Sequence, residues 1–196
     1  MSAQGLEVLA YTFATVFLAE LGDKTQLAIL ALSLRGQRAR VLAGAALAFS
    51  LVNGLSSAVG YAAHMFIPLW AIRLASAIAF LAVGALGLAL GLLRRAEQEE
   101  GDKLEEAPSV LRSFVLVALA ELGDKTQLAT VGFSALTGLA ALVALGAVLA
   151  LMSMAALTCA IGGELAKRLH GRKAELLAYT IFLAVGLAML LWPWLE

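Results

Sequence analysis

The sequence predicts an all-α integral membrane protein whose six transmembrane helices form two inverted three-helix repeats. Three observations predict this fold: an apolar composition, six long apolar runs, and one motif that occurs twice. Of the 196 residues, 62% are hydrophobic and 14% are charged, whereas a typical soluble domain has about 25% charged residues. The lipid bilayer is therefore the expected environment of most of the chain.

The charge balance and the cysteine content exclude several classes of function. Fourteen Lys and Arg residues balance fourteen Asp and Glu residues, so no basic excess remains to bind the phosphates of a nucleic acid. Cys159 is the single cysteine of the chain, which excludes an internal disulfide and a cysteine cluster for zinc or iron–sulfur. We expect no nucleic-acid partner and no cofactor.

Six apolar runs are long enough to span a bilayer, since a spanning helix needs about 20 mostly apolar residues. Basic residues gather in alternate joints between these runs, and cytoplasmic loops collect Lys and Arg. We therefore expect these three joints in the cytoplasm and both termini outside, in a cell (inner) membrane. The runs are 6–34, 41–66, 69–93, 110–135, 139–161 and 174–194. The basic residues are Arg35, Arg38, Arg40, Arg94, Arg95, Lys103, Arg112, Lys167, Arg168, Arg172 and Lys173.

An internal repeat divides the chain into two halves. The segment LAELGDKTQLA occupies residues 18–28 and again residues 119–129. A unit of three spans followed by its copy must insert upside down, and inverted repeats are common in secondary transporters, where the binding site lies between the halves. We expect a first three-helix repeat over 1–95, an acidic cytoplasmic linker over 96–109, and an inverted second repeat over 110–196.

The repeated motif places four acids at membrane depth: Glu20, Asp23, Glu121 and Asp124. Each would cost roughly 2.5–3.5 kcal/mol at the centre of a spanning helix, so such residues normally face the protein interior or a water-filled cavity. Residues three apart on a regular helix share one face. The two motifs, related by a pseudo-two-fold axis, are therefore expected to converge on one central place.

The donor atoms of this place are oxygens, and six to eight oxygens suit hard divalent cations such as Ca²⁺, Mg²⁺ or Mn²⁺. The four acids are the predicted metal ligands, and the residual charge of the four acids and two lysines would be balanced by one divalent ion. Protons could replace a departing ion, because crowded carboxylates do not all stay ionised. Supporting residues are Thr25, Gln26, Thr126, Gln127, Lys24, Lys125 and, ranked last, Asn53. The threonine hydroxyls would reach the site if the helix opens near Gly22.

Two copies of Glu-x-Gly-Asp-(Lys/Arg)-(Thr/Ser), one in each half, resemble the Gdt-type cation transporter family. This family includes bacterial MneA-like manganese exporters and Golgi and thylakoid relatives, and it is grouped with the cation/Ca²⁺ exchangers. The resemblance covers essentially the whole chain. It implies export of Mn²⁺, or of Ca²⁺ in some relatives, from the cytosol in exchange for protons. It also implies that Glu20, Asp23, Glu121 and Asp124 bind the transported ion.

Other interpretations compete with a divalent cation/proton antiporter. The acids could form structural salt bridges, Glu20 with Lys24 and Glu121 with Lys125, which leaves Asp23 and Asp124 unpaired. An intramembrane aspartyl protease is disfavoured by the lysine beside each Asp, so we expect no enzyme. A six-span exporter of an organic cation or amino acid, with the acids as a proton relay, is the main alternative. An ungated channel is disfavoured by the inverted repeat. Gly87-x-x-x-Gly91 would allow close helix contact, within one chain or between two.

Overall fold

The structure is a computed structural model that describes residues 3–21, 23–34, 37–93, 109–161 and 172–191. The described residues form eight helices and no strand. Residues 96–108 of the expected acidic linker lie outside them. The helices are α1 (Ala3–Ala19), α2 (Lys24–Ser33), α3 (Arg38–Phe66), α4 (Leu69–Leu93), α5 (Val110–Glu121), α6 (Lys125–Thr137), α7 (Ala140–Ile161) and α9 (Arg172–Leu191).

The first and fourth predicted runs differ from the expectation of one helix each. The first run is divided between α1 and α2, and the fourth between α5 and α6. Both divisions fall inside the repeated motif, where an Asp side chain at the start of the following helix favours a helix beginning. Gly123 has a φ of +80°, a conformation that glycine adopts readily and that ends a helix. The motif therefore interrupts the helix that its apolar neighbours favour.

Three described helices are long and apolar enough to cross a membrane: Arg38–Phe66, Leu69–Ala89 and Ala140–Ala160. They correspond to the second, third and fifth predicted spans. Ala3–Ala19 and Tyr179–Leu191 are apolar but shorter. The six-span count therefore stays a prediction.

The outer face of α3 is apolar, as expected for contact with lipid. An exposed row at intervals of four residues contrasts with the small and apolar side chains that α3 buries. Large apolar patches on a protein surface mark contact with another protein or with a membrane. The exposed row is Leu47, Leu51, Leu55 and Val59, and the buried side includes Ala45, Ala48, Phe49 and Val52.

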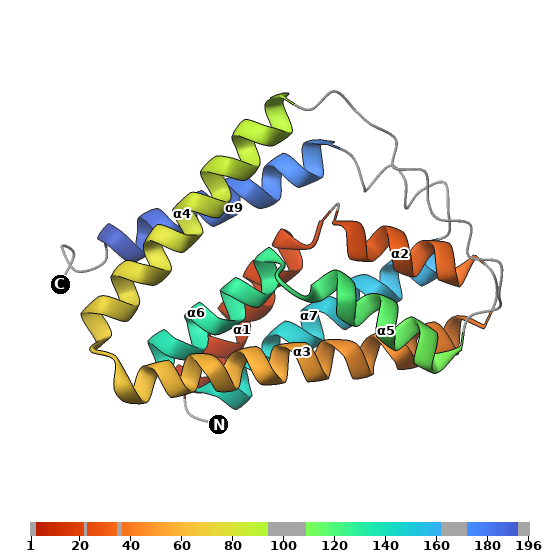
Figure 1. Ribbon diagram of the computed structural model, residues 1–196, viewed down its shortest axis with the longest axis horizontal. Coiled ribbons are helices and arrows are strands. Elements are labelled where there is room, and N and C mark those ends of the chain that lie inside the picture. The colour runs from red at the N-terminus through yellow and green to blue at the C-terminus, as the bar shows by residue number, and fades with distance from the viewer. Residues whose placement is uncertain (1–2, 22, 35–36, 94–108, 162–171, 192–196) are drawn as a thin grey trace.

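The main helix contacts join one half of the chain to the other half. Helix α1 packs on α7, and its counterpart α5 packs on α3. Helix α6 likewise packs on α3 and α2 on α7, while α4 pairs with α9. Figure 1 shows that counterpart helices run in opposite directions, with the two helix breaks near the middle of α3 and α7. The halves therefore form one core.

Glycines of α3 allow this close packing. A Cβ added to Gly44 would lie 2.5 Å from the carbonyl oxygen of Val110 on α5. A Cβ added to Gly60 would lie 2.3 Å from the carbonyl oxygen of Val131 on α6. Small residues let helix backbones approach in this way inside a membrane.

We predict that Gly60→Ala lowers the stability of the folded protein by about 1–3 kcal/mol, because the added methyl group overpacks the α3–α6 contact. Gly54→Ala is the matched control, since a Cβ at Gly54 meets no atom within 4 Å. Thermal unfolding of the purified variants in detergent measures the difference. Equal midpoints for the two variants would contradict the packing of α3 against α6.

Candidate metal centre

The two helix breaks have nearly the same backbone geometry. Asp23 precedes α2 with φ −83° and ψ 161°, and Asp124 precedes α6 with φ −83° and ψ 166°. Each carboxylate thus lies at a helix N-terminus, where unpaired N–H groups and the helix dipole favour negative charge. The Asp124 carboxylate accepts a hydrogen bond from the backbone N–H of Thr126 at 3.4 Å, whereas Asp23 makes no side-chain capping hydrogen bond.

Three of the four predicted acids come together in one cluster. Carboxylate oxygens of Glu20, Asp23 and Asp124 all lie within 4.8 Å of one another. Glu20 and Asp23 come from the first motif and Asp124 from the second, so both halves of the chain contribute. Glu20 is fully buried, and the Asp23 side chain is 14% exposed. The acid cluster, defined as these three residues, therefore combines one buried acid with two partly exposed ones.

Glu121, the fourth acid, is joined to the acid cluster through Thr126. The Thr126 hydroxyl lies 3.0 Å from Glu121 Oε2 and 3.4 Å from Asp124 Oδ2. The other oxygen of this carboxylate, Glu121 Oε1, is buried without a hydrogen-bond partner among the described residues, and so is Glu20 Oε2. Buried polar atoms are normally paired. These two buried acceptor oxygens therefore lack a hydrogen-bond donor among the described residues.

The two glutamines of the repeated motif have different contacts. Gln26 Nε2 donates to Glu20 Oε1 at 3.2 Å, and Gln26 Oε1 accepts from the hydroxyl of Thr158 on α7 at 2.8 Å. Gln127 Oε1 instead accepts from the backbone N–H of Gly123 at 2.7 Å. Gln26 therefore orients an acid of the cluster, whereas Gln127 stabilises the break between α5 and α6. Thr25 is buried beside Gln26.

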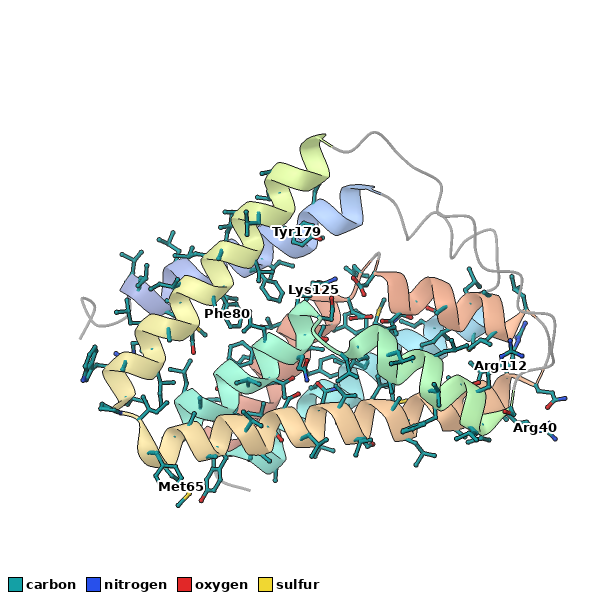
Figure 2. All side chains as sticks on the ribbon, viewed as in Figure 1. Arg40, Met65, Phe80, Arg112, Lys125 and Tyr179 are labelled. Carbon is teal, nitrogen blue, oxygen red and sulfur yellow. The ribbon has the colours of Figure 1, made fainter. Side chains whose placement is uncertain are left out.

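Lys125 pairs with Asp23 of the other half of the chain. The Lys125 ammonium group donates to Asp23 Oδ1, and the lysine is 8% exposed. In Figure 2, Lys125 lies near the middle of the molecule. The pairing of Glu121 with Lys125 that the structural interpretation requires is not the one observed. The side chain of Lys24 lies outside the described residues.

Asn53 lies on α3, on the face that contacts α6. Its Oδ1 is 2.9 Å from the hydroxyl of Thr130 on α6, and its Nδ2 donates to the carbonyl of Phe49 at 3.0 Å. Neither Thr130 nor Thr158 is among the site residues predicted from the sequence. Thr130 follows Thr126 by four residues and so lies on the same helix face, a spacing that could have identified it. Thr158 has no such signal, because it is distant in sequence from both motifs.

The acid cluster has the chemistry of a site for a hard divalent cation. Carboxylates are the ligands that Ca²⁺, Mg²⁺ and Mn²⁺ prefer. Such ions bind oxygens at about 2.0–2.6 Å, so two ligand atoms on opposite sides of one ion lie at most about 5 Å apart. The 4.8 Å limit for the oxygens of Glu20, Asp23 and Asp124 fits this size. The cluster contains neither His nor Cys.

Comparison with known proteins identifies the family. A family model described as "Divalent cation/proton antiporter GDT1" matches the chain twice, over residues 8–94 and 109–195. The chain belongs to the GDT1 family. Each match contains one copy of the motif, and GDT1 proteins are membrane transporters rather than an enzyme family. The family resemblance predicted from the doubled motif is thereby confirmed.

Two relatives of this GDT1 protein were found among curated proteins. "GDT1-like protein 5" of Arabidopsis thaliana is 27% identical over 223 residues, which cover 96% of this chain and 97% of the relative. "Putative manganese exporter" of Vibrio cholerae is 29% identical over 127 residues, which cover 64% of this chain and 60% of the relative. No solved structure matches the chain.

We predict that Gly123→Ala destabilises the break between α5 and α6. The φ of +80° costs a residue with a Cβ roughly 1–2 kcal/mol, although a Cβ at this position meets no atom within 4 Å. The thermal unfolding midpoint in detergent should therefore fall. Gly54→Ala again controls for the added methyl group, and an unchanged midpoint for Gly123→Ala would show that the break does not need a left-handed residue.

Proposed function

We propose that this GDT1-family protein exports a divalent cation, Mn²⁺ or alternatively Ca²⁺, from the cytosol in exchange for protons. The observation that carries the proposal is the acid cluster of Glu20, Asp23 and Asp124, which both motif copies build. The family description supports a divalent cation and protons as substrates. The name of the Vibrio cholerae relative supports Mn²⁺ and the outward direction.

In this proposal the transported ion binds to the acid cluster, and Glu121 supplies a further carboxylate. The free oxygens Glu20 Oε2 and Glu121 Oε1 are available as ligands. Gln26 holds Glu20 by its other oxygen, and Thr126 holds Glu121. Because a ligand that is already oriented loses little freedom when the ion binds, these hydrogen bonds favour binding. Protons neutralise the same carboxylates when the ion has left.

The distribution of basic residues supports the proposed orientation in a cell (inner) membrane. Figure 2 shows Arg40 and Arg112 together at one end of the bundle, and Met65 at the opposite end. Positive charge near the ends of spans is typical of the cytoplasmic side. We place the end that carries the two arginines in the cytoplasm. The beginning of α1 and the end of α6 then face outward, on the other side of the acid cluster.

The central test is ion flux in proteoliposomes. We predict saturable Mn²⁺ transport that is coupled to an imposed pH gradient, and we expect Asp23→Asn and Asp124→Asn each to abolish it. Each substitution removes one carboxylate of the acid cluster while keeping nearly the same side-chain volume. A divalent-sensitive dye inside the vesicles reports the flux, and size-exclusion chromatography reports folding.

Glu7→Gln is the matched control, because it neutralises an exposed acid on α1 outside the acid cluster. It should transport at the wild-type rate. Normal transport by both Asp variants would overturn the assignment of the site. No flux of Mn²⁺, Ca²⁺ or Mg²⁺ through folded wild-type protein would overturn the proposed function.

We also propose that the ion is released by alternating access, with the α4–α9 pair as a moving body. Glycines join these two helices closely. A Cβ at Gly84 would lie 2.8 Å from the backbone nitrogen of Leu183, and one at Gly87 would lie 2.2 Å from the ring of Tyr179. Because interdigitated surfaces resist sliding, α4 and α9 are expected to move together.

The α4–α9 pair packs unequally on the two sides of the acid cluster. Helix α4 packs on α6 and α9 packs on α1, but neither packs closely on α2 or α5 (Figure 1). Aromatic rings form the contact between α4 and α6, where the ring centroids of Phe80 and Phe133 lie 5.6 Å apart. Within the α4–α9 pair, the centroids of Phe80 and Phe182 lie 5.1 Å apart. In the proposed orientation, this contact closes the outer side of the acid cluster, so transport requires it to open.

A disulfide across this contact tests the proposal. A Cβ at Gly132 would lie 3.7 Å from the Cβ of Ser76, within the range of about 3.5–4.5 Å found for disulfides. In a Cys159→Ala background, the pair Ser76→Cys and Gly132→Cys should lose Mn²⁺ transport on oxidation and regain it on reduction. Each single-cysteine variant controls for the substitutions. Full transport by the oxidised, cross-linked protein would contradict an opening between α4 and α6.

A further inference from the structure

Lys125 places a positive charge inside the candidate metal centre. Its ammonium group is paired with Asp23, one of the three residues of the acid cluster, and it reaches that carboxylate from the other half of the chain. The lysine is buried and the Asp23 side chain is 14% exposed. A buried ion pair of this kind is costly to form and is weak evidence for a purely stabilising role.

The neighbouring Asp124 differs from Asp23 in how it is held. Asp124 caps α6 through the backbone N–H of Thr126, whereas Asp23 makes no capping hydrogen bond to α2. The described contact of the Asp23 carboxylate is with the Lys125 ammonium group. Of the two aspartates in the cluster, the lysine therefore holds the one that the following helix does not cap.

We propose that Lys125 is the charge filter of this transporter. In the protein without a bound ion, its ammonium group occupies the position at Asp23 that a metal ion would take. An incoming ion must displace the ammonium group from that carboxylate. The inference rests on the proposed function, because it concerns the selectivity of the same site. It assigns Lys125 as the residue that admits divalent and rejects monovalent cations.

The reason is a comparison of charges at one place. A sodium or potassium ion carries the same single charge as the tethered ammonium group, so the exchange gains no attraction to the carboxylates. The tether also gives the ammonium group a high local concentration. A divalent ion brings twice the charge, and attraction to several carboxylates scales with that charge. Replacement of the ammonium group is therefore favourable for a divalent ion alone.

The same comparison predicts that Lys125 weakens divalent binding. An ammonium group and a divalent ion close to one carboxylate repel each other, and this repulsion is only partly screened inside a protein. Binding is then loose enough for release on the far side of the membrane. A transporter needs such release, since an ion held too tightly would not leave.

The test compares ion binding by wild-type protein and by Lys125→Gln, both purified in detergent. Calorimetry with Mn²⁺ is carried out in a sodium-free and potassium-free buffer and then with added NaCl, with N-methylglucamine chloride at equal ionic strength as the salt control. For Lys125→Gln we expect Mn²⁺ affinity in sodium-free buffer to rise by about tenfold or more, because the internal competitor is gone. We also expect Na⁺ to compete with Mn²⁺ in this variant and not in the wild type.

Arg73→Gln is the matched control, since it removes one positive charge from α4 outside the centre, and it should bind Mn²⁺ as the wild type does. Lys125→Met is a second variant that fills similar volume without a polar atom, in case Lys125→Gln does not yield monodisperse protein. Lys125→Arg keeps the charge and should keep the rejection of Na⁺.

The two possible failures can be told apart. If wild-type protein binds no divalent ion, the proposed function fails. If wild-type protein binds Mn²⁺ but the neutral variants bind it more weakly and stay insensitive to Na⁺, Lys125 is a structural partner of Asp23 and the charge filter is overturned.

Discussion

The constraint on which this structure depends is the cost of burying carboxylates among apolar helices. Each buried acid needs a positive or hydrogen-bonding partner, because little water is available there. The helix breaks supply part of this stabilisation, since Asp23 and Asp124 each lie at the beginning of a helix, where the helix dipole favours negative charge. Lys125, Gln26 and Thr126 supply the rest. The interruption of two apolar helices is thus a consequence of the acids that they carry.

Identical sequences acquire different roles here because their surroundings differ. The two motifs share eleven residues in a row, yet Gln26 holds an acid and Gln127 holds a backbone N–H. Gln26 of the first motif accepts a hydrogen bond from Thr158 of α7. Close to the second motif, Thr130 of α6 instead donates to Asn53 of α3. A pseudo-symmetric core therefore contains an asymmetric site. Electrostatic partners across the halves, such as Asp23 with Lys125, follow from this packing and not from the motif alone.

The sequence was sufficient for the helical class, the family, and the convergence of Glu20, Asp23 and Asp124, because a strong energetic penalty leaves such acids few alternatives. The sequence did not predict that the runs 6–34 and 110–135 are each divided into two helices, because the apolar pattern of a run does not report a local break at Gly and Asp. It also missed Thr158, whose contact with Gln26 spans the two halves. Spacing arguments describe neighbours on one helix, and contacts between distant helices depend on how the whole bundle packs.

The unequal packing of the α4–α9 pair matters for the proposed alternating access, because the internal repeat gives each helix that the pair contacts a counterpart in the other half. Counterpart helices of the two halves build similar contacts, as α1 on α7 and α5 on α3 do. In the proposed alternating access, the observed contact of α4 and α9 with α6 and α1 alternates with a corresponding contact with α2 and α5. The two halves differ at this contact, because Phe133 of α6 lies against Phe80, whereas the position that corresponds to Phe133 in the first half is Leu32. The proposed alternating access therefore requires that the ion bind the two arrangements with different affinity, because a ligand shifts such an equilibrium only by that difference.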